Sequence, residues 1–142
     1  APDVAFFGQK DAQQVLVVRR LVRDLDIPVR IEACPIVREP DGLAMSSRNV
    51  YLDPAARVQA AALQRALAAA DAAAKAGERD AAVLVAAAAA VLADAGIEPE
   101  YLELRATDDL RLLERVEDEG LLAVAARVGG ARLIDNLVLR PN

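Results

Sequence analysis

The sequence predicts an α/β protein that begins with one strand–helix–strand unit and continues as a small α+β domain. Within residues 4–36, an apolar run, a helical pattern and a second extended run follow one another, which is typical of a βαβ unit with parallel strands. Residues 53–139 instead contain two alanine-rich helical patterns and then three extended segments, the last two separated by two glycines. We therefore expect a domain boundary near Asp53, with residues 1–52 in the first domain and residues 53–142 in the second.

The composition excludes several classes of function. The 142 residues are 55% apolar, and the excess is mostly alanine, which favours long helices. The net charge of −5 comes from residues 53–142, because residues 1–52 carry equal numbers of acidic and basic side chains. This acidity and the scarcity of aromatic residues argue against a nucleic-acid partner. No stretch resembles a signal peptide or is apolar enough to span a bilayer, so we expect a cytoplasmic protein without a membrane partner.

Cysteine and histidine usage removes further chemistries. The single cysteine, Cys34, excludes an internal disulfide, and its apolar neighbours predict a buried, inert thiol. The chain has no histidine, which removes the usual general base, the Ser–His pair and the commonest metal ligand. We therefore expect no metal centre held by protein side chains.

Local patterns define the first unit. Residues 4–8 are a continuous apolar run that ends in a glycine, which predicts a strand buried on both faces. Residues 11–24 have helical periodicity. The expected inward face of this helix consists of Val15, Val18, Leu21, Val22 and Leu25. Pro28 ends the helix, because the residue before a proline avoids the helical region, and residues 29–36 are extended again.

The second domain begins with two helical patterns. Asp53-Pro54 combines an acidic N-cap with a proline at the first helical position, and the helix continues through residues 55–75. Its expected inward face consists of Val58, Ala62, Leu63, Ala66, Leu67 and Ala70. Gly77 ends this helix, and a second helix spans residues 80–95 before another glycine.

Extended segments complete the second domain. Residues 101–105 alternate between apolar and polar side chains and read as a strand, and a short charged helix is expected over residues 107–113. Residues 121–128 and 132–139 flank Gly129-Gly130, a strong hairpin signal. We expect a helical hairpin packed on a mainly antiparallel sheet.

Two polar clusters follow the two strands of the first unit. Gly8-Gln9-Lys10-Asp11 lies just past the first strand, and Met45-Ser46-Ser47-Arg48-Asn49 lies beyond the second. Lysine and arginine are phosphate-binding residues, and hydroxyls and helix-start amides supply further donors. Because ligands of parallel sheets bind outside the carboxyl ends of the strands, we expect both clusters to face one crevice.

Plainer interpretations of these residues stay open at this point. Lys10 alone can be a surface lysine, and the second cluster can be a polar loop before a helix cap. Asp11 can cap the first helix or bind a ribose, and Gln13 and Gln14 can be surface residues or can orient a substrate. Tyr51 is expected to pack rather than to react. Other acidic residues read as a solvated face without the spacing of a calcium loop: Asp108, Asp109, Glu117, Asp118 and Glu119.

Three stretches carry a family resemblance. The first is Phe7-Gly8-Gln9-Lys10-Asp11-Ala12-Gln13-Gln14, and the second is Arg38-Glu39-Pro40-Asp41-Gly42-Leu43-Ala44-Met45-Ser46-Ser47-Arg48-Asn49 with Tyr51-Leu52. The third consists of Tyr101-Leu102-Glu103-Leu104 and Arg132-Leu133-Ile134-Asp135-Asn136. Together they resemble the pantothenate synthetases (pantoate–β-alanine ligases). The resemblance implies an adenylating nucleotidyltransferase, in which residues 1–52 belong to a Rossmann-like nucleotide-binding domain and residues 45–48 form the mobile KMSKS-type loop.

The resemblance implies a two-step reaction on small-molecule substrates. ATP and pantoate give pantoyl adenylate and pyrophosphate, and β-alanine then displaces AMP to give pantothenate. The implied ATP-binding residues are Gly8, Gln9, Lys10, Asp11, Val37, Met45, Ser46, Ser47 and Arg48. Lys10, Ser46, Ser47 and Arg48 are the implied catalytic residues, Val37 contacts adenine through its backbone, and Gln14 holds pantoate. Mg²⁺ is expected mainly on the phosphates, and the parent enzyme is expected to be a homodimer.

The sequence departs from this family in one respect. The N-terminal part of the nucleotide domain, with the HxGH signature, has no counterpart, so the chain looks like the C-terminal half of the enzyme. We expect it not to make pantothenate at a useful rate alone, and we expect residues 1–50 to pair with another chain or to be loosely ordered. Two alternatives remain: a non-catalytic C-terminal lid or assembly module, and a different nucleotide-binding α/β protein whose loops coincide by chance.

Overall fold

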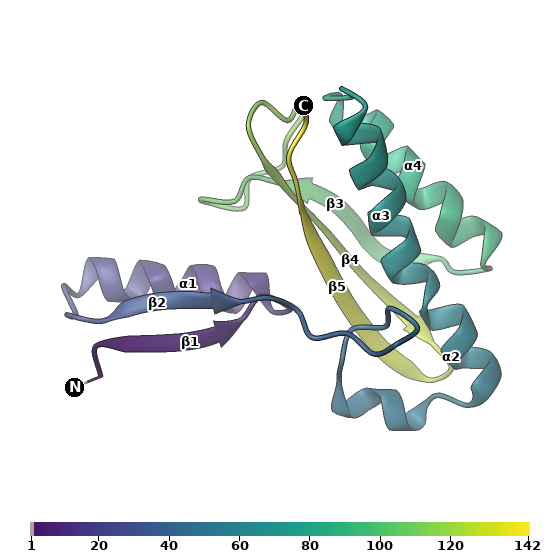
Figure 1. The fold of residues 1–142 in the computed structure, drawn as a ribbon, viewed down its shortest axis with the longest axis horizontal. Helices are drawn as coiled ribbons and strands as arrows, with labels where there is room; N and C mark the ends of the chain where they lie inside the picture. Colours follow the sequence, from purple (N-terminus) through teal and green to yellow (C-terminus); the bar gives the residue numbers. More distant parts are fainter. Residues whose placement is uncertain (1) are drawn as a thin grey trace.

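The computed structural model describes residues 2–142, which form two units side by side (Figure 1). The first unit consists of β1 (Val4–Gly8), α1 (Ala12–Asp24) and β2 (Arg30–Cys34). β1 and β2 are parallel and pair along their whole length. α1 begins after the N-cap Asp11, as the local sequence predicts. The expected βαβ unit is therefore confirmed.

The first unit is less buried than its apolar sequence predicts. Phe6 in β1 is 69% exposed, and Leu21 and Leu25 near the end of α1 are 52% and 63% exposed, whereas Val15 is buried. The prediction of a strand buried on both faces is wrong, because the sheet of β1 and β2 has two strands in residues 2–142 and α1 covers one of its faces (Figure 1). An apolar run predicts a strand, but its burial depends on what covers it.

Two single-residue burial predictions are also wrong. Cys34 is exposed, because it is the last residue of β2 and lies at the open end of the two-stranded sheet. Tyr51 ends the short 3-10 helix η1 (Ser47–Tyr51) and is 73% exposed, so it does not pack as expected.

Three helices begin the second unit: α2 (Pro54–Ala60), α3 (Ala62–Lys75) and α4 (Ala81–Asp94). Asp53 and Asp80 cap α2 and α4 through side-chain hydrogen bonds to backbone N–H groups, as predicted. The single helix predicted over residues 55–75 is divided at Ala61 into α2 and α3. Ala61 keeps helical dihedral angles, and alanine favours helices, so the local sequence does not predict this break. Val58, before the interruption, is 72% exposed instead of inward, whereas the expected inward residues after it are buried in α3. Within residues 2–142, every helix is too short or too polar to cross a bilayer.

The strands of the second unit form one antiparallel sheet. β3 (Pro99–Arg105), β4 (Gly120–Val128) and β5 (Ala131–Leu139) lie in the order β3-β4-β5. Gly129 and Gly130 make the turn between β4 and β5 with φ values of +54° and +82°, the left-handed region that favours glycine. The predicted hairpin is confirmed, and so is the α+β arrangement of a helical hairpin on an antiparallel sheet.

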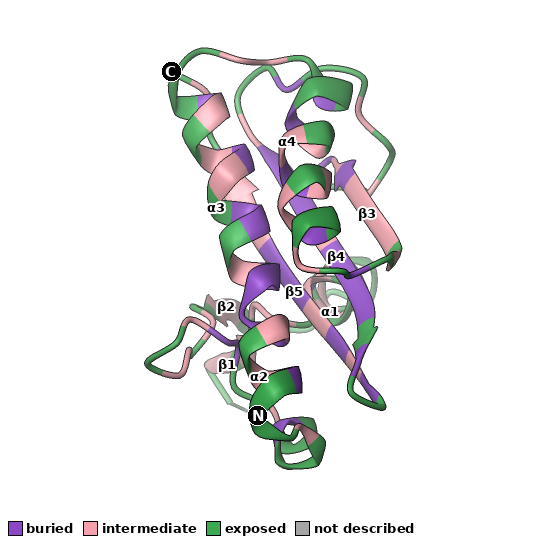
Figure 2. Ribbon diagram, turned by 90° about the vertical axis from the view of Figure 1, so that its right-hand side faces the viewer, coloured by how far each residue is buried: buried purple, intermediate pink, exposed green. Residues whose placement is uncertain are grey.

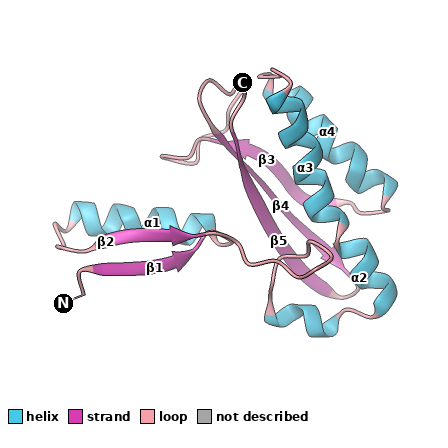
Figure 3. Cartoon of the chain, viewed as in Figure 1, coloured by secondary structure: helices cyan, strands magenta, loops and turns pink. Residues whose placement is uncertain are grey.

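The core of the protein lies between α3 and α4 and the sheet that they cover (Figures 2 and 3). Its largest fully buried side chains are Leu63, Leu67, Leu84, Leu92, Leu122, Leu139, Val116 and Val124. Leu43, from the loop after β2, also packs into this core. Leu43 precedes the predicted domain boundary near Asp53 but shares the core of the second unit, so the position of this boundary stays a prediction. The other face of the sheet looks toward α1, and this face carries the site described below.

The prediction of a helix over residues 107–113 is wrong. This segment, between β3 and β4, is a series of turns in which the Asp108 carboxylate accepts a hydrogen bond from Asp109 N and the Asp109 carboxylate accepts one from Arg111 N. Leu110 has a φ of +60°, which no helix contains. Aspartate side chains that bond to nearby backbone N–H groups compete with helix formation, and two of them are adjacent here. Residues 108, 109, 117 and 118 are exposed, so the prediction of a solvated acidic face holds for them.

Candidate functional site

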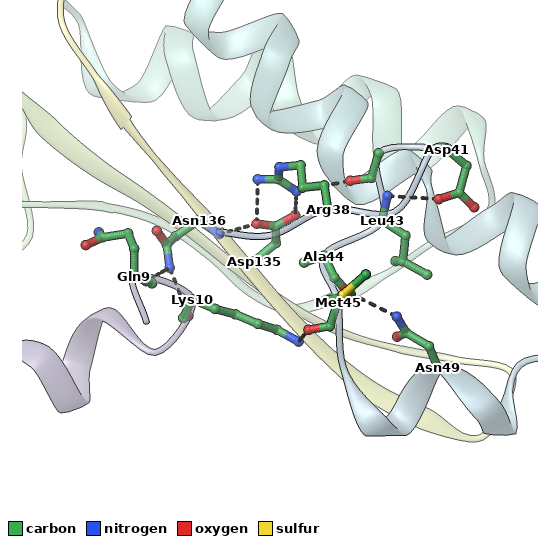
Figure 4. Close-up of polar contacts among 11 residues, drawn as sticks. Gln9, Lys10, Arg38, Asp41, Leu43, Ala44, Met45, Asn49, Asp135 and Asn136 are labelled. Atoms are coloured by element: carbon green, nitrogen blue, oxygen red, sulfur yellow. Dashed lines mark hydrogen bonds and ion pairs between the residues drawn. The ribbon is translucent and has the colours of Figure 1, made fainter. Parts of the chain in front are cut away.

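The two polar clusters predicted from the sequence meet in the structure (Figure 4). Lys10 follows the carboxyl end of β1, and Met45 lies in the loop after β2. Lys10 Nζ donates a hydrogen bond of 3.1 Å to Met45 O. Because β1 and β2 are parallel, their carboxyl ends lie at the same edge of the sheet, which brings the loops that follow them together. The two clusters therefore lie in contact, as expected, whereas the expectation that both face one crevice stays a prediction.

The first cluster forms the start of α1. Asp11 Oδ1 accepts a 3.1 Å hydrogen bond from Gln14 N, so the carboxylate acts as the N-cap of α1. Gln9 N donates a 2.8 Å hydrogen bond to Cys34 O, which ties the cluster to the end of β2. At Gly8, no heavy atom lies within 4 Å of the position that a Cβ would take. The first cluster therefore presents an ammonium group beside a helix start, with open space next to it.

The loop before the second cluster is held by backbone and side-chain contacts. Met45 N donates a 2.9 Å hydrogen bond to Val37 O, so the loop between them closes on itself. The buried Asn49 side chain donates from Nδ2 to Ala44 O at 3.1 Å and to Glu39 Oε1 at 3.2 Å. Arg57 of α2 forms an ion pair with the same Glu39. The loop is thus fixed from both ends, which positions Met45 O for Lys10.

Ser46 is the N-cap of the 3-10 helix η1, and Arg48 lies in its first turn. Ser46 Oγ accepts a 3.2 Å hydrogen bond from Arg48 N, so the plainer interpretation of a helix cap is part of what this cluster does. A hydroxyl that accepts one hydrogen bond still has a proton to donate. Arg48 Nη1 donates to Arg132 O on β5 at 3.4 Å, which brings the guanidinium to the edge of the three-stranded sheet.

The electrostatics of the site are set by two neighbouring cations, Lys10 and Arg48, and by the buried carboxylate of Asp135. Partial burial lowers the pKa of Lys10, the carboxylate of Asp135 acts in the opposite direction, and the positive charge of Arg48 lowers the pKa further. The effect of Arg48 means that the two cationic side chains are close enough to repel each other. Two cations held close to each other attract a multiply charged anion more strongly than either does alone.

A cavity of about 800 Å³ opens beside these residues, between the start of α1 and the face of the sheet that the helices leave uncovered. Its lining includes Lys10, Asp11 and Gln13 from the first unit and Tyr101, Arg132 and Asn136 from the sheet. Both units therefore contribute to one concave, mostly polar site.

Of the predicted site residues, only Lys10 and Asp11 line this cavity. Gln14 is exposed on α1 and is absent from the cavity lining, although the neighbouring Gln13 belongs to it. Val37 is 63% exposed, and its carbonyl already accepts the hydrogen bond from Met45 N. Ser47 is exposed on η1. The structure brings Lys10, Met45 and Arg48 together, but it does not bring Gln14 to them.

Three further polar residues lie at the site, in stretches that carry the family resemblance, and sequence reasoning gave them no role. Arg38 forms an ion pair with Asp135, which is 3% exposed, and Asn136 is 4% exposed and bonds to the first cluster. One signal was available: Asp135-Asn136 interrupts an otherwise apolar run in the last strand, and polar side chains on a buried strand need partners. The sequence does not say which partners they have.

The donor set does not provide a metal site. Within residues 2–142, no group of three or more Cys, Asp or Glu side chains is arranged to hold a metal ion. Asp11 is used as a cap and Asp135 is paired with Arg38. The cavity lining carries both signs of charge: the basic side chains of Lys10, Arg105 and Arg132, and the carboxylates of Asp11, Glu103, Asp109 and Asp135.

The fold and this site define an α/β protein with a lysine and an arginine close together near the carboxyl ends of two parallel strands, next to a small α+β domain. The family model for pantoate–β-alanine ligase matches residues 1–138. The chain therefore belongs to the pantoate–β-alanine ligase family, and a chance coincidence of loops in an unrelated nucleotide-binding protein is excluded.

Similar proteins support this assignment over the whole chain. The chain is 53% identical over 139 residues to the pantothenate synthetase of Roseiflexus castenholzii, covering 97% of this chain and 50% of that protein. It is 54% identical to a bifunctional pantoate ligase/cytidylate kinase of Synechococcus elongatus, covering 98% of this chain and 27% of that protein. The chain thus spans about half the length of the pantothenate synthetases that it matches, and less of the bifunctional protein.

Two solved structures are similar in fold. The crystal structure of pantothenate synthetase from Thermus thermophilus matches with a TM-score of 0.92 and 44% identity, covering 99% of this chain and 51% of that one. The pantoate–β-alanine ligase from Francisella tularensis, in complex with β,γ-ATP and β-alanine, matches with a TM-score of 0.62 and 27% identity, covering 96% of this chain and 44% of that one.

Proposed function

We propose that this chain forms the C-terminal part of an ATP-dependent ligase that condenses pantoate with β-alanine to give pantothenate. The reaction proceeds through a pantoyl adenylate and releases pyrophosphate and AMP. The observation that carries the proposal is the contact between Lys10 Nζ and Met45 O, because it brings the two phosphate-suited clusters of a family member into one site.

The proposed roles follow from the chemistry of each group. Lys10 and Arg48 neutralise the charge that develops on the leaving pyrophosphate, and the hydroxyls of Ser46 and Ser47 donate to phosphate oxygens. Residues 45–48 act as a KMSKS-type loop. The remaining ATP contacts are assigned to Gly8, Gln9, Asp11, Met45 and the backbone of Val37. Gln14 is assigned to pantoate, which requires it to act from the exposed side of α1.

Adenylation needs little from protein nucleophiles. The carboxylate of pantoate attacks the α-phosphorus of ATP, and the bond to pyrophosphate breaks, so catalysis comes from positioning and from neutralising the leaving group. Mg²⁺ on the phosphates supplies further charge neutralisation when it is bound, and its oxygen ligands come mainly from ATP and water. The Francisella tularensis relative, in complex with β,γ-ATP and β-alanine, supports these substrate classes.

We further propose that residues 1–52 belong to the nucleotide-binding domain and that residues 53–142 form a domain that closes over the site. The parent enzyme is proposed to be a cytoplasmic homodimer with no nucleic-acid or membrane partner. A lone unpaired cysteine agrees with a reducing compartment.

A second candidate is a non-catalytic lid or assembly module. It is favoured by one observation: the packed core begins at Leu43 and excludes the side chains of β1, α1 and β2. A segment with its own core can fold and dock without binding nucleotide itself.

ATP titration by calorimetry tests the proposal. We expect the wild-type chain to bind ATP, and we expect Lys10→Ala and Arg48→Ala each to weaken binding by about tenfold or more, since each removes a charge from the same anion site. Lys75→Ala and Arg115→Ala are matched controls, because both remove an exposed cation that pairs with a surface carboxylate elsewhere. Wild-type affinity in the Lys10 and Arg48 variants would contradict the proposed roles, and no binding by any form would favour the lid module.

A further inference from the structure

We propose that Asp135 and Asn136 are positioning residues for the phosphate site, and that this pair on β5 holds the Lys10 and Met45 clusters at a fixed spacing. Asn136 holds the main chain of the first cluster, and Asp135 holds the loop that carries the second (Figure 4). The inference rests on the proposed function, but it concerns two residues that lie outside the ATP- and pantoate-binding residues proposed above.

Asn136 binds the chain directly at Lys10. Its Nδ2 donates to Gln9 O at 2.9 Å and to Lys10 O at 3.0 Å, across 127 and 126 residues of sequence. These two carbonyls lie between the end of β1 and the start of α1, so the contacts fix the main chain from which the Lys10 side chain leaves. The side chain of Asn136 is buried, and its Oδ1 has no hydrogen-bond partner within residues 2–142. An unpaired buried amide oxygen lowers the stability of the fold. Any stabilisation by the Asn136 side chain therefore comes from the two hydrogen bonds that its Nδ2 donates.

Asp135 binds the other cluster through Arg38. Its two carboxylate oxygens accept hydrogen bonds from Arg38 Nη1 and Nη2 at 2.6 and 3.0 Å. Arg38 Nη1 also donates to Gly42 O at 3.1 Å, which places the guanidinium inside the loop that leads to Met45. A planar, two-bonded pair constrains orientation as well as distance. Asp135 therefore fixes the loop whose carbonyl receives the Lys10 ammonium.

The two residues act on different clusters because they are neighbours on a strand. Successive side chains of a strand point to opposite faces. Asp135 pairs across the sheet with Val124, which is fully buried in the core, and Asn136 pairs with Ala123, which lines the open cavity. The backbone of β5 is hydrogen-bonded to β4 along its whole length, so it is a rigid spacer between the two clusters. Asp135 also lines the cavity beside Lys10, and its charge raises the pKa of Lys10, so the carboxylate acts on the first cluster as well as on the loop that it binds.

The chain is well suited to a spectroscopic test. It has one methionine, Met45, so a ¹³C-methyl methionine label gives one signal, which reports on the second cluster. It has two lysines, Lys10 and Lys75, and the Lys10 side-chain signal is assigned by comparison with a Lys75→Arg variant. Both signals report on the site whether or not ATP binds.

Asn136→Ala and Asn136→Leu are compared with Gln59→Ala. Gln59 is a matched control, because its Nε2 also donates to two consecutive carbonyls, Ala95 O at 3.0 Å and Gly96 O at 3.3 Å, but it does so away from the cavity. Asn136→Leu keeps the size of the side chain without its donors, which guards against failure of the alanine variant to fold. We expect both Asn136 variants to shift the Met45 and Lys10 signals and to raise the dissociation constant for ATP about tenfold, with little change for AMP, which lacks the β- and γ-phosphates. Gln59→Ala is expected to leave all of these unchanged.

The outcomes separate this inference from the proposed function. If the wild-type chain binds ATP but the Asn136 variants keep wild-type signals and affinity, the positioning role is overturned and the proposed function stands. If the wild-type chain does not bind ATP but the Asn136 variants still shift both signals relative to Gln59→Ala, the positioning is supported and the function proposed for this chain fails. If the wild-type chain does not bind ATP and the Asn136 variants do not shift the signals, both the positioning role and the function proposed for this chain are overturned.

Discussion

Arg38 and Asp135, separated by 97 residues of sequence, form an ion pair with two hydrogen bonds between the loop after β2 and the last strand. The two ends of this pair differ in burial: the Arg38 side chain is 25% exposed and that of Asp135 is 2% exposed. Removing the arginine would leave a buried carboxylate without its counter-ion, whereas removing the carboxylate leaves a guanidinium that water can reach.

This difference predicts unequal costs of substitution. We expect Arg38→Met to lower the free energy of unfolding by about 3 kcal/mol and Asp135→Asn by about 1 kcal/mol, because an uncompensated buried charge is the costlier state. Urea denaturation at pH 7 measures both values. Equal losses, or a larger loss for Asp135→Asn, would show that the burial of the carboxylate does not control the stability of this pair.

The second prediction concerns the protonation of Lys10. Burial and Arg48 hold its pKa below the usual lysine value of 10.5, against the opposing effect of Asp135. The folded protein therefore binds this proton less tightly than the unfolded chain does, so the contribution of Lys10 to stability rises as the pH increases from its folded pKa toward 10.5. We expect pyrophosphate to raise the pKa of Lys10 and Asp135→Asn to lower it further. A ¹³C titration of the Lys10 side chain measures both shifts. A Lys10 pKa that is the same with and without pyrophosphate would argue against anion binding beside this group.

The hairpin glycines provide a matched pair for a third prediction. A Cβ at Gly129 would lie 2.5 Å from Ala56 Cβ, whereas a Cβ at Gly130 would meet no atom within 4 Å. Both residues have positive φ, so alanine at Gly130 adds only the backbone strain of about 1 kcal/mol, and alanine at Gly129 adds a clash with α2 as well. We expect Gly129→Ala to lower the melting temperature clearly more than Gly130→Ala does, and similar melting temperatures would contradict the close packing of the hairpin against α2.

The exposed apolar side chains of the first unit lead to a fourth prediction. We expect the amides of β1, α1 and β2 to exchange with deuterium faster than those of α3 and β4, because few apolar side chains of this unit are buried and local opening exposes little further surface. Mass spectrometry of peptic peptides checks this order. Equal protection of β1 and β4 in a monomer would refute the expectation that residues 1–50 are loosely ordered unless another chain pairs with them.

A fifth prediction concerns turnover. We expect the chain alone to release AMP from ATP, pantoate and β-alanine at least about a hundredfold more slowly than the full-length Roseiflexus castenholzii relative, since losing even one transition-state donor has an effect of this size. A coupled assay for AMP measures the rate, with the relative as positive control. Near-normal turnover would show that residues 1–142 contain a complete site.

Local sequence patterns determined the elements of this protein. Local signals mark the ends of these elements: the aspartate caps at 11, 53 and 80, the glycine at 77 and the Gly129-Gly130 turn. Each signal acts on residues close to it in the sequence, so the helices and the hairpin can be predicted from the sequence. The order of strand, helix and strand also led to the prediction that Lys10 and the Met45 loop lie at the same edge, because the carboxyl ends of parallel strands lie together.

Only the tertiary structure decided what surrounds those elements. Phe6, Cys34 and Tyr51 are exposed despite apolar or aromatic character, since burial is set by what other segments cover. The roles of Asp135 and Asn136 depend on the register of β5 and on which loops reach its two faces, contacts that span more than half of the chain. Such contacts arise from the packing of distant segments, and no local pattern encodes them.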